Sequence, residues 1–247
     1  MTARIGFSTG AMVVDHTPPL TERIAYARNL GCTAIELGHV RVERYRNEPL
    51  RDIDTALLSS FDWVSLHAPG GQWSYDNRPA TERLFQDIAD LHARHPLDVV
   101  IFHPDAVGDL SLLQGLPFPV GVENMDRAKR GFRTVDDFRP VFDRHPDWSF
   151  ILDLQHCFSN DVRMDNVRAF VDAFGDRIVE IQVSGAGDVR ERQGKPVAVR
   201  HVSLSIVHQD AINQQVSKFS QYPIIIESGC PTLDDVNREY SYVRALV

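Results

Sequence analysis

The chain has 247 residues, of which 43% are hydrophobic and 24% charged, and its formal net charge is −8. This composition excludes a disordered or fibrous chain. The acidic balance disfavours nucleic acid as a partner, because phosphate backbones are bound by basic surfaces. No apolar run approaches the roughly 20 residues that span a bilayer, and the first residues lack a signal-peptide pattern. We therefore expect a cytoplasmic protein with no membrane partner.

Eight short runs rich in Val, Ile and Phe alternate with longer segments of helical period. The expected strands cover residues 4–8, 34–37, 63–67, 99–103, 119–123, 150–153, 178–183 and 223–227. Runs such as Val99 to Phe102 are apolar throughout, which is typical of parallel strands buried on both faces.

The expected helices cover residues 20–30, 50–60, 81–94, 135–144, 162–174, 207–219 and 233–246, with only a short helix over 109–116. Gly31 and Gly175 are expected C-caps, and Thr134 and Thr232 are expected N-caps. Eight alternating units, without a GxGxxG fingerprint after the first strand, favour a closed barrel over an open doubly wound sheet. The sequence thus predicts a single (β/α)8 TIM barrel domain over residues 1–247.

Cys32, Cys157 and Cys230 are isolated in the sequence. Without a CxxC pair they predict neither a disulfide framework nor a thiolate zinc site, and we interpret them as buried thiols.

Residues that bind metals or move protons stand at or just after six of the eight expected strands. They are Glu36, His67, His103, Glu123, Asp153 with nearby His156, and Glu227. In a barrel these strand ends converge on one face, where the active sites of this fold are built. Several buried carboxylates in one place repel each other, and a bound divalent cation relieves that repulsion. Carboxylate and imidazole ligands without thiolates allow Mn²⁺, Mg²⁺, Co²⁺ or Zn²⁺.

With these residues in place, the chain resembles the xylose-isomerase-like barrel superfamily. This superfamily includes sugar isomerases and epimerases, inosose dehydratase and abasic-site nucleases of the endonuclease IV type. The matching segments are residues 30–37, Val64 to His67, His103-Pro104, Val122 to Asn124, Leu152-Asp153 with His156, and Ile225 to Glu227. They follow one another in order over nearly the whole barrel.

The resemblance implies that one divalent ion is held by Glu123, Asp153 and Glu227. On the seventh strand this sequence departs from the family, because Gln182 stands at the position of a histidine ligand and Gly185 at that of an aspartate. A glutamine can bind a metal through its amide oxygen, so Gln182 completes the implied ligand set. The alternative is that the substitution removes the metal site.

Endonuclease IV-like proteins hold three zinc ions with more histidines. The matching positions here are His67, His103, His156 and His201. Gln182 replaces one expected histidine, and Val199 stands where an aspartate precedes His201 in the family. Both departures argue against an intact trinuclear cluster.

The leading hypothesis is a metal-dependent isomerase or epimerase that acts on a sugar, sugar phosphate or polyol by proton abstraction next to a carbonyl. Glu123 and Glu227 are the expected catalytic pair. The expected substrate-binding residues are His67, His103, His156, His201 and Glu36. A dehydratase could share this arrangement, since it begins with the same proton abstraction. The alternatives are a zinc-dependent phosphodiesterase and a non-catalytic ligand-binding barrel; a homo-oligomer stays open.

Two loops are candidates for the substrate end of the pocket. Residues 68–79 carry Trp73, Tyr75 and Asn77, which offer aromatic surface for a sugar ring, or form an ordinary packed loop. The glycine-rich residues 185–187, followed by Arg190, Arg192 and Lys195, predict either a phosphate or carboxylate site or a solvated loop.

Overall fold

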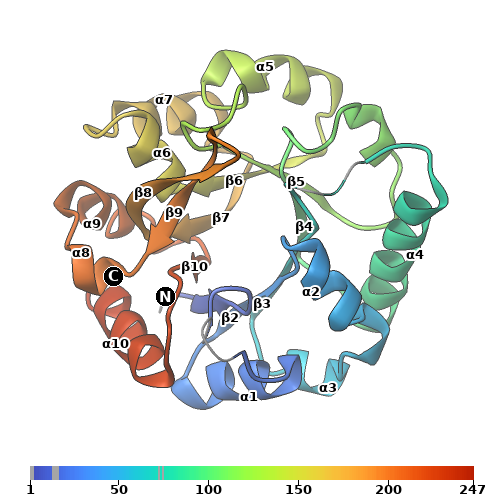
Figure 1. Cartoon of the computed structure of the whole chain (residues 1–247), viewed down its shortest axis with the longest axis horizontal. Coiled ribbons are helices and arrows are strands. Elements are labelled where there is room, and N and C mark those ends of the chain that lie inside the picture. Colours follow the sequence, from blue (N-terminus) through green and yellow to red (C-terminus); the bar gives the residue numbers. More distant parts are fainter. Residues whose placement is uncertain (1–2, 13–16, 72, 74) are drawn as a thin grey trace.

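In the computed structural model, which describes residues 3–12, 17–71, 73 and 75–247, eight parallel strands close into a barrel (Figure 1). The strands are β1 (Ile5–Ser8), β2 (Ala34–Gly38), β3 (Trp63–His67), β4 (Val99–Phe102), β5 (Val120–Glu123), β6 (Ser149–Asp153), β7 (Ile178–Val183) and β10 (Ile224–Ile226). Their order around the ring is β1-β10-β7-β6-β5-β4-β3-β2. The predicted (β/α)8 barrel is therefore confirmed.

The helices lie outside the ring of strands (Figure 1). They are α1 (Leu20–Leu30), α2 (Val42–Asn47), α3 (Thr55–Leu58), α4 (Pro79–Arg94), α5 (Val135–Arg144), α6 (Leu154–Asn160), α7 (Asp165–Phe174), α8 (Leu204–Val207), α9 (Asp210–Val216) and α10 (Leu233–Arg244). Two 3₁₀ helices, Leu50–Asp52 and Leu110–Leu113, complete the connections. Within the described part of the chain, none of the helices combines the length and the apolar character that a membrane crossing needs.

The barrel has a large apolar layer outside the strands and a small one inside. Alternate strand residues such as Val100 and Phe102 belong to the large cluster that packs against the helices. Val99 and Ile101, which alternate with them on β4, form a separate cluster within the barrel together with Ile151 of β6. This separation follows from the two-residue period of a strand. The apolar filling inside is thin, and polar side chains occupy much of the remaining interior.

The four predicted helix caps are confirmed. Gly31 ends α1 with φ of 92°, a left-handed conformation that glycine adopts readily. Thr134 and Thr232 begin α5 and α10 with complete capping boxes. Gly175 is the C-cap of α7, and it ends the helix with right-handed angles rather than the left-handed ones of Gly31.

Several predicted helices are shorter or split. Residues 50–60 form a 3₁₀ turn and then α3, because the Asp54 side chain caps the Ala56 amide at 3.0 Å and starts a new helix there. Residues 207–219 are divided at His208, whose φ of 48° ends α8 before α9 begins. The helix expected from residue 162 starts only at Asp165, and residues 109–116 form just one 3₁₀ turn.

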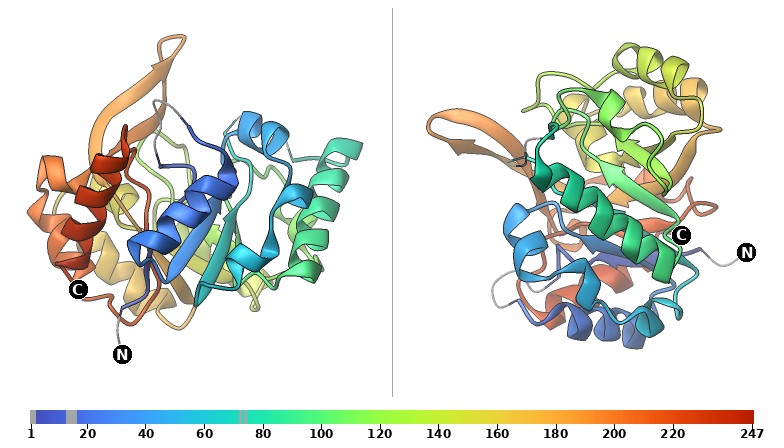
Figure 2. Two further views of the ribbon diagram at one scale, coloured as in Figure 1. Left: turned by 90° about the horizontal axis from the view of Figure 1, so that it is seen from below. Right: turned by 90° about the vertical axis from the view of Figure 1, so that its right-hand side faces the viewer.

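An antiparallel hairpin follows β7, formed by β8 (Gly185–Arg192) and β9 (Lys195–Val202). Figure 2 shows it projecting beyond the barrel at the end where the strands finish. The loop expected at residues 185–187 is therefore wrong, since these residues lie in a strand, whereas the anion site stays a prediction. Arg190, Arg192 and Lys195 are exposed towards the hairpin tip.

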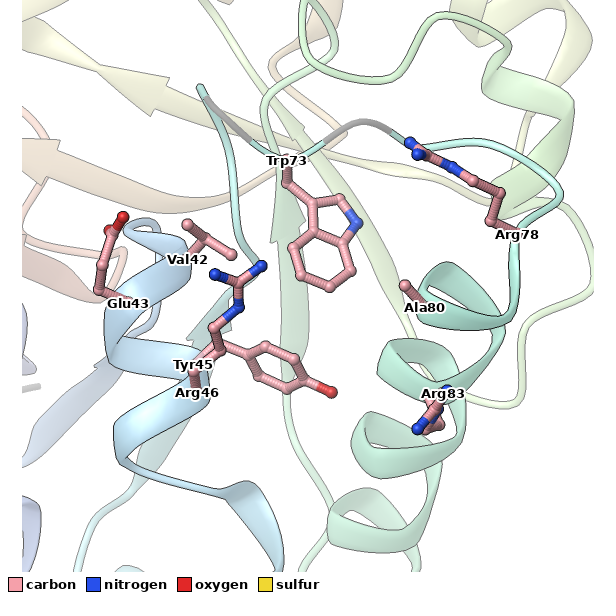
Figure 3. Close-up of a pocket in the computed structure, with 8 residues that line it drawn as sticks. All are labelled: Val42, Glu43, Tyr45, Arg46, Trp73, Arg78, Ala80 and Arg83. Atoms are coloured by element: carbon pink, nitrogen blue, oxygen red, sulfur yellow. The ribbon is translucent and has the colours of Figure 1, made fainter.

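The aromatic residues predicted in the loop after β3 have different surroundings. Tyr75 is buried; its hydroxyl donates to the Pro69 carbonyl at 2.6 Å and its ring contacts Phe102. It therefore belongs to the core and offers no surface to a sugar. Trp73 lines a pocket between α2 and α4 (Figure 3), while Asn77 is exposed. Gln72 and Ser74 of the predicted loop lie outside the described residues.

The three cysteines are free and buried, as predicted from their isolation in the sequence. Burial raises the pKa of Cys32 to about 12, which keeps this thiol protonated and unreactive.

Candidate metal centre and proton-transfer site

The structure brings the predicted site residues together at one end of the barrel. They are Glu36 on β2, His67 on β3, His103 after β4, Glu123 on β5, Asp153 on β6, His156 on α6, Gln182 on β7, His201 on β9 and Glu227 after β10. Their charges act on one another: those of Glu36, Glu123 and Asp153 all influence Glu227. The convergence follows from eight parallel strands that end on the same face.

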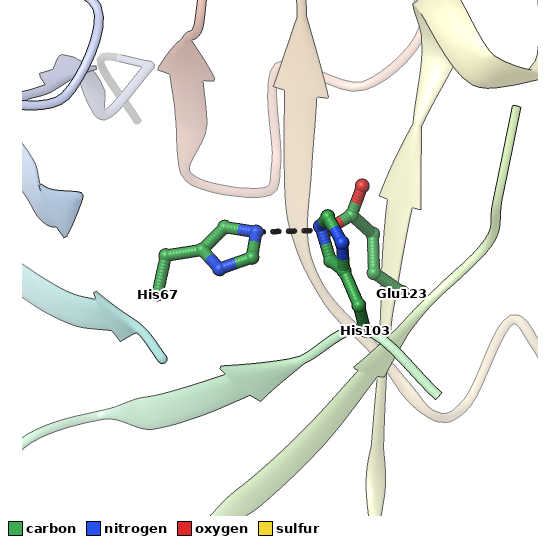
Figure 4. A group of neighbouring side chains, drawn as sticks. All are labelled: His67, His103 and Glu123. Carbon is green, nitrogen blue, oxygen red and sulfur yellow. Dashed lines mark hydrogen bonds and ion pairs between the residues drawn. The ribbon is translucent and has the colours of Figure 1, made fainter. Parts of the chain in front are cut away.

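A first group consists of His67, His103 and Glu123, from three neighbouring strands (Figure 4). The Glu123 Oε2 atom lies 3.0 Å from His67 Nε2 and 3.1 Å from His103 Nε2. The two imidazole rings meet edge to face, with centroids 4.7 Å apart. One ligand atom from each of the three residues lies within 4.8 Å of the others, a spacing that suits a single cation.

A second group consists of Asp153, His156 and His201, with ligand atoms at similar spacing. Asp153 ends β6 and caps α6, because its Oδ1 atom accepts the His156 amide at 2.6 Å. This cap places His156 next to the strand end. His201 comes from the hairpin, and its ring centroid lies 5.2 Å from that of His156. The hairpin thus contributes one side chain to the site.

Glu123 lies between the two groups. Its Oε1 atom is 2.9 Å from His156 Nδ1, although that ring nitrogen lies closer, at 2.7 Å, to the Asn124 carbonyl and bonds there. Burial alone would raise the pKa of Glu123, but His103, His156 and His67 together hold it well below its usual range. Glu123 is therefore an ionised carboxylate although it is fully buried.

The pKa values of Asp153 and Glu227, in contrast, are raised. Burial raises the pKa of Asp153 to about 7. Burial, followed by the charges of Glu36, Glu123 and Asp153, raises the pKa of Glu227 well above its usual range. These shifts result from several carboxylates confined to one buried space, a situation that favours either bound protons or a bound cation.

The histidines of this buried site have pKa values shifted in opposite directions. Burial and the neighbouring His156 lower the pKa of His201 to about 3, so its ring is neutral and free to bind a cation. Burial alone would lower the pKa of His67, but the hydrogen bond that its Nε2 donates to Glu123 and the charge of Glu36 raise it to about 9. A proton and a cation would therefore compete for His67.

Several buried side-chain oxygens make no hydrogen bond to the described residues, and three of these oxygens belong to predicted metal ligands. They are Glu123 Oε1, Asp153 Oδ2 and Gln182 Oε1. The Gln182 amide nitrogen donates to Glu36 Oε2 at 2.8 Å, which leaves the amide oxygen available. Unpaired buried oxygens are costly, and oxygen ligands suit a hard divalent cation. The donor set therefore fits the implied metal.

Glu36 lies lower in the barrel than the sequence indicated. It pairs in register with Ser8 and Ser65, two residues before β2 ends, and it is fully buried. Its carboxylate contacts Gln182 beneath the strand ends. Direct contact between Glu36 and a substrate stays a prediction.

Three further residues, which the sequence did not predict, lie at or beneath this site. Asp126, in the loop after β5, is buried, lies 3.9 Å from His156 Nε2 and accepts the Val199 amide at 3.1 Å. Ser184 lies 2.9 Å from His201 Nδ1. Glu180 lies beneath Gln182 on β7. The two-residue alternation on β7 was the available signal for Glu180, whereas Asp126 depends on how the hairpin docks.

No protein-family model matches this sequence, and neither does any curated protein. Among solved structures, the fold is similar to a D-tagatose 3-epimerase-like protein, with TM-score 0.67 and 11% identity, covering 100% of this chain and 97% of that one. It is similar to the probable 3-DHS dehydratase AsbF of Bacillus anthracis, with TM-score 0.65, 14% identity and 98% of each chain covered. It is similar to a D-allulose 3-epimerase from Methylomonas sp., with TM-score 0.63 and 15% identity, covering 100% of this chain and 98% of that one.

Further similar structures are xylose isomerase domain proteins. The resemblance to the xylose-isomerase-like barrels is thereby confirmed at the level of the fold. At these identities the likeness says nothing of the reaction, which has to be argued from the site.

Proposed function

We propose that this chain is a divalent-metal-dependent isomerase or epimerase that moves a proton next to the carbonyl of a small sugar-like substrate. The observation that carries the proposal is that buried oxygens of Glu123, Asp153 and Gln182 have no hydrogen-bond donor among the described residues, beside the raised pKa of Glu227. Epimerases and a dehydratase among the similar structures support the reaction class. A divalent cation bound there would polarise the substrate carbonyl.

The two glutamates have different surroundings and therefore different roles. The Glu123 side chain is 1% exposed and is held by His67 and His103, so it serves mainly to hold the cation. The Glu227 side chain is 15% exposed, and its nearest ionic partner, His201 Nδ1, is 3.7 Å away. Glu227 is thus better placed to take up and return a substrate proton.

The environment of Glu227 suits proton transfer near neutral pH. Burial, and then the neighbouring carboxylates, raise the pKa of Glu227, and a cation in the site would lower it again. A carboxyl group exchanges protons efficiently when its pKa lies close to the working pH. His201 and His156 are close enough to contact substrate hydroxyls beside it.

The test is exchange of substrate protons with solvent. Ketopentoses and ketohexoses are incubated in D₂O with the enzyme and Mn²⁺, Co²⁺, Mg²⁺ or Zn²⁺, and deuterium beside the carbonyl is measured by NMR. We expect metal-dependent exchange that falls by roughly 10²–10⁴-fold in Glu227→Gln. The exposed Glu191→Gln variant is the matched control and should exchange like the parent. Absence of exchange with every ketose and metal would contradict the proposal.

A second candidate is a two-metal phosphodiesterase. It is favoured by the two separate ligand groups, His67 with His103 and Glu123, and Asp153 with His156 and His201. Paired cations suit in-line displacement at phosphorus. Two zinc ions per chain together with hydrolysis of bis(p-nitrophenyl) phosphate would favour this function over the first.

A further inference from the structure

A pocket of about 580 Å³ lies between α2 and the beginning of α4 (Figure 3). Val42, Glu43, Tyr45 and Arg46 line it from the α2 side, and Trp73, Arg78, Ala80 and Arg83 from the other. None of these residues belongs to the two ligand groups at the strand ends. A pocket of this volume is large enough for a small organic molecule.

The pocket wall is positively charged although the chain is acidic. It has three arginines and one carboxylate, Glu43, whereas the chain has a net charge of −8. Arg78 pairs with Asp76. Arg46 and Arg83 form no ion pair or hydrogen bond with any other described residue, so their guanidinium groups are available to a ligand. Guanidinium groups recognise phosphate oxygens by paired N–H donors.

Two further donors lie at the same space. Ala80 is in the first turn of α4, a 16-residue helix whose N-cap, Arg78, makes no side-chain cap. Pro79 has no N–H, and the Thr81 and Glu82 amides donate to the Arg78 carbonyl. The Ala80 amide therefore remains as the backbone donor that this helix start offers to an anion. Trp73 Nε1 is buried without a hydrogen-bond partner, and Figure 3 shows it on the side of the indole that faces the first turn of α4.

We propose that this pocket binds the phosphate group of a small phosphorylated molecule. The donors come from α2, from the loop at Trp73 and from the start of α4, which suits a tetrahedral group with oxygens in several directions better than a flat carboxylate. Tyr45 and Trp73, with ring centroids 5.6 Å apart, supply apolar surface for the organic part of the ligand. This binding does not depend on the metal site or on the proposed reaction.

The indole N–H of Trp73 gives a direct readout. The chain has three tryptophans, so three indole N–H signals appear in a ¹⁵N-correlated NMR spectrum, and Trp73→Phe assigns one of them. Inorganic phosphate is titrated as the probe, with acetate as the comparison. We expect a saturable shift of the Trp73 signal with phosphate, and at least tenfold weaker binding of acetate.

Charge-matched variants separate the pocket from general attraction. Arg46→Gln with Arg83→Gln should raise the phosphate dissociation constant at least tenfold. Arg139→Gln with Arg168→Gln removes two exposed arginines from α5 and α7 and should leave it within twofold of the parent. Phenyl phosphate should bind more tightly than inorganic phosphate.

The Glu227→Gln variant distinguishes failure of this inference from failure of the proposed function, because it should bind phosphate like the parent. A shift that stays linear with phosphate concentration, or an equal affinity in both double variants, would overturn the inference. Acetate binding as tight as phosphate would overturn the assignment to phosphate.

Discussion

Glu123 keeps its charge in a buried site because imidazoles surround it on both oxygens. His67 and His103 contact one oxygen, and His156 lies beside the other. The nearest imidazole nitrogens lie farther from Asp153 and Glu227, at 3.9 and 3.7 Å, and the pKa of each carboxyl group is raised. One buried space therefore holds an ionised carboxylate and carboxyl groups that retain protons, the kind of contrast found between general bases and acids.

Glu180 is a further buried carboxyl group, beneath the site, and its bound proton can be tested by measuring stability. Its Oε2 atom accepts the Trp63 indole N–H at 2.6 Å, and burial, then the charge of Glu36, raises its pKa from 4.5 to about 8. The folded state thus binds this proton more tightly than the unfolded state. The resulting stability is present below about pH 4.5 and is lost as the pH rises through 8.

We therefore expect Glu180→Gln to become more stable relative to the parent as the pH rises from 5 to 9, by roughly 1–3 kcal/mol. Urea unfolding at each pH measures the difference. The exposed Glu191→Gln variant should show no such trend. A constant difference between Glu180→Gln and the parent at all pH values would refute this assignment of the proton.

At the scale of elements, apolar runs were sufficient to predict all eight barrel strands, because these strands are buried on both faces. The β8–β9 hairpin was missed because most of its residues are exposed and it has no continuous apolar face. The helix α6 was missed because it has seven residues and begins directly after β6, with Asp153 serving as both strand end and cap. Partners such as Asp126 depend on tertiary contacts that spacing does not encode.

The helix caps predicted from sequence can be tested by stability. The Thr232 hydroxyl accepts the Asp235 amide at 3.2 Å, and Asp235 Oδ2 accepts the Thr232 amide at 3.0 Å. Thr232→Ala should reduce the free energy of unfolding by about 1 kcal/mol, because it leaves an α10 amide without its acceptor. The control is Thr21→Ala, an exposed threonine within α1. Equal stability of the two variants would show that the box contributes little.

At the scale of the whole molecule, the barrel has an apolar outer layer and a largely polar interior. The outer layer of apolar contacts between strands and helices holds the fold together. The interior has only a small apolar cluster and is rich in buried polar groups, among them Glu36, Glu180 and Gln182. An interior of this kind costs stability when its charges are unpaired. Binding of a cation at the strand ends should therefore raise the melting temperature as well as enable the reaction.

The most direct test of the account is the metal content of the purified protein after incubation with Mn²⁺ or Zn²⁺ and removal of free ions. Elemental analysis should find about one divalent ion per chain, lost in the Glu123→Gln, Glu227→Gln double variant. The bound ion should be retained when two exposed glutamates, Glu82 and Glu191, are changed to Gln. A folded parent protein that binds no divalent ion, or a double variant that binds as much as the parent, would contradict the account.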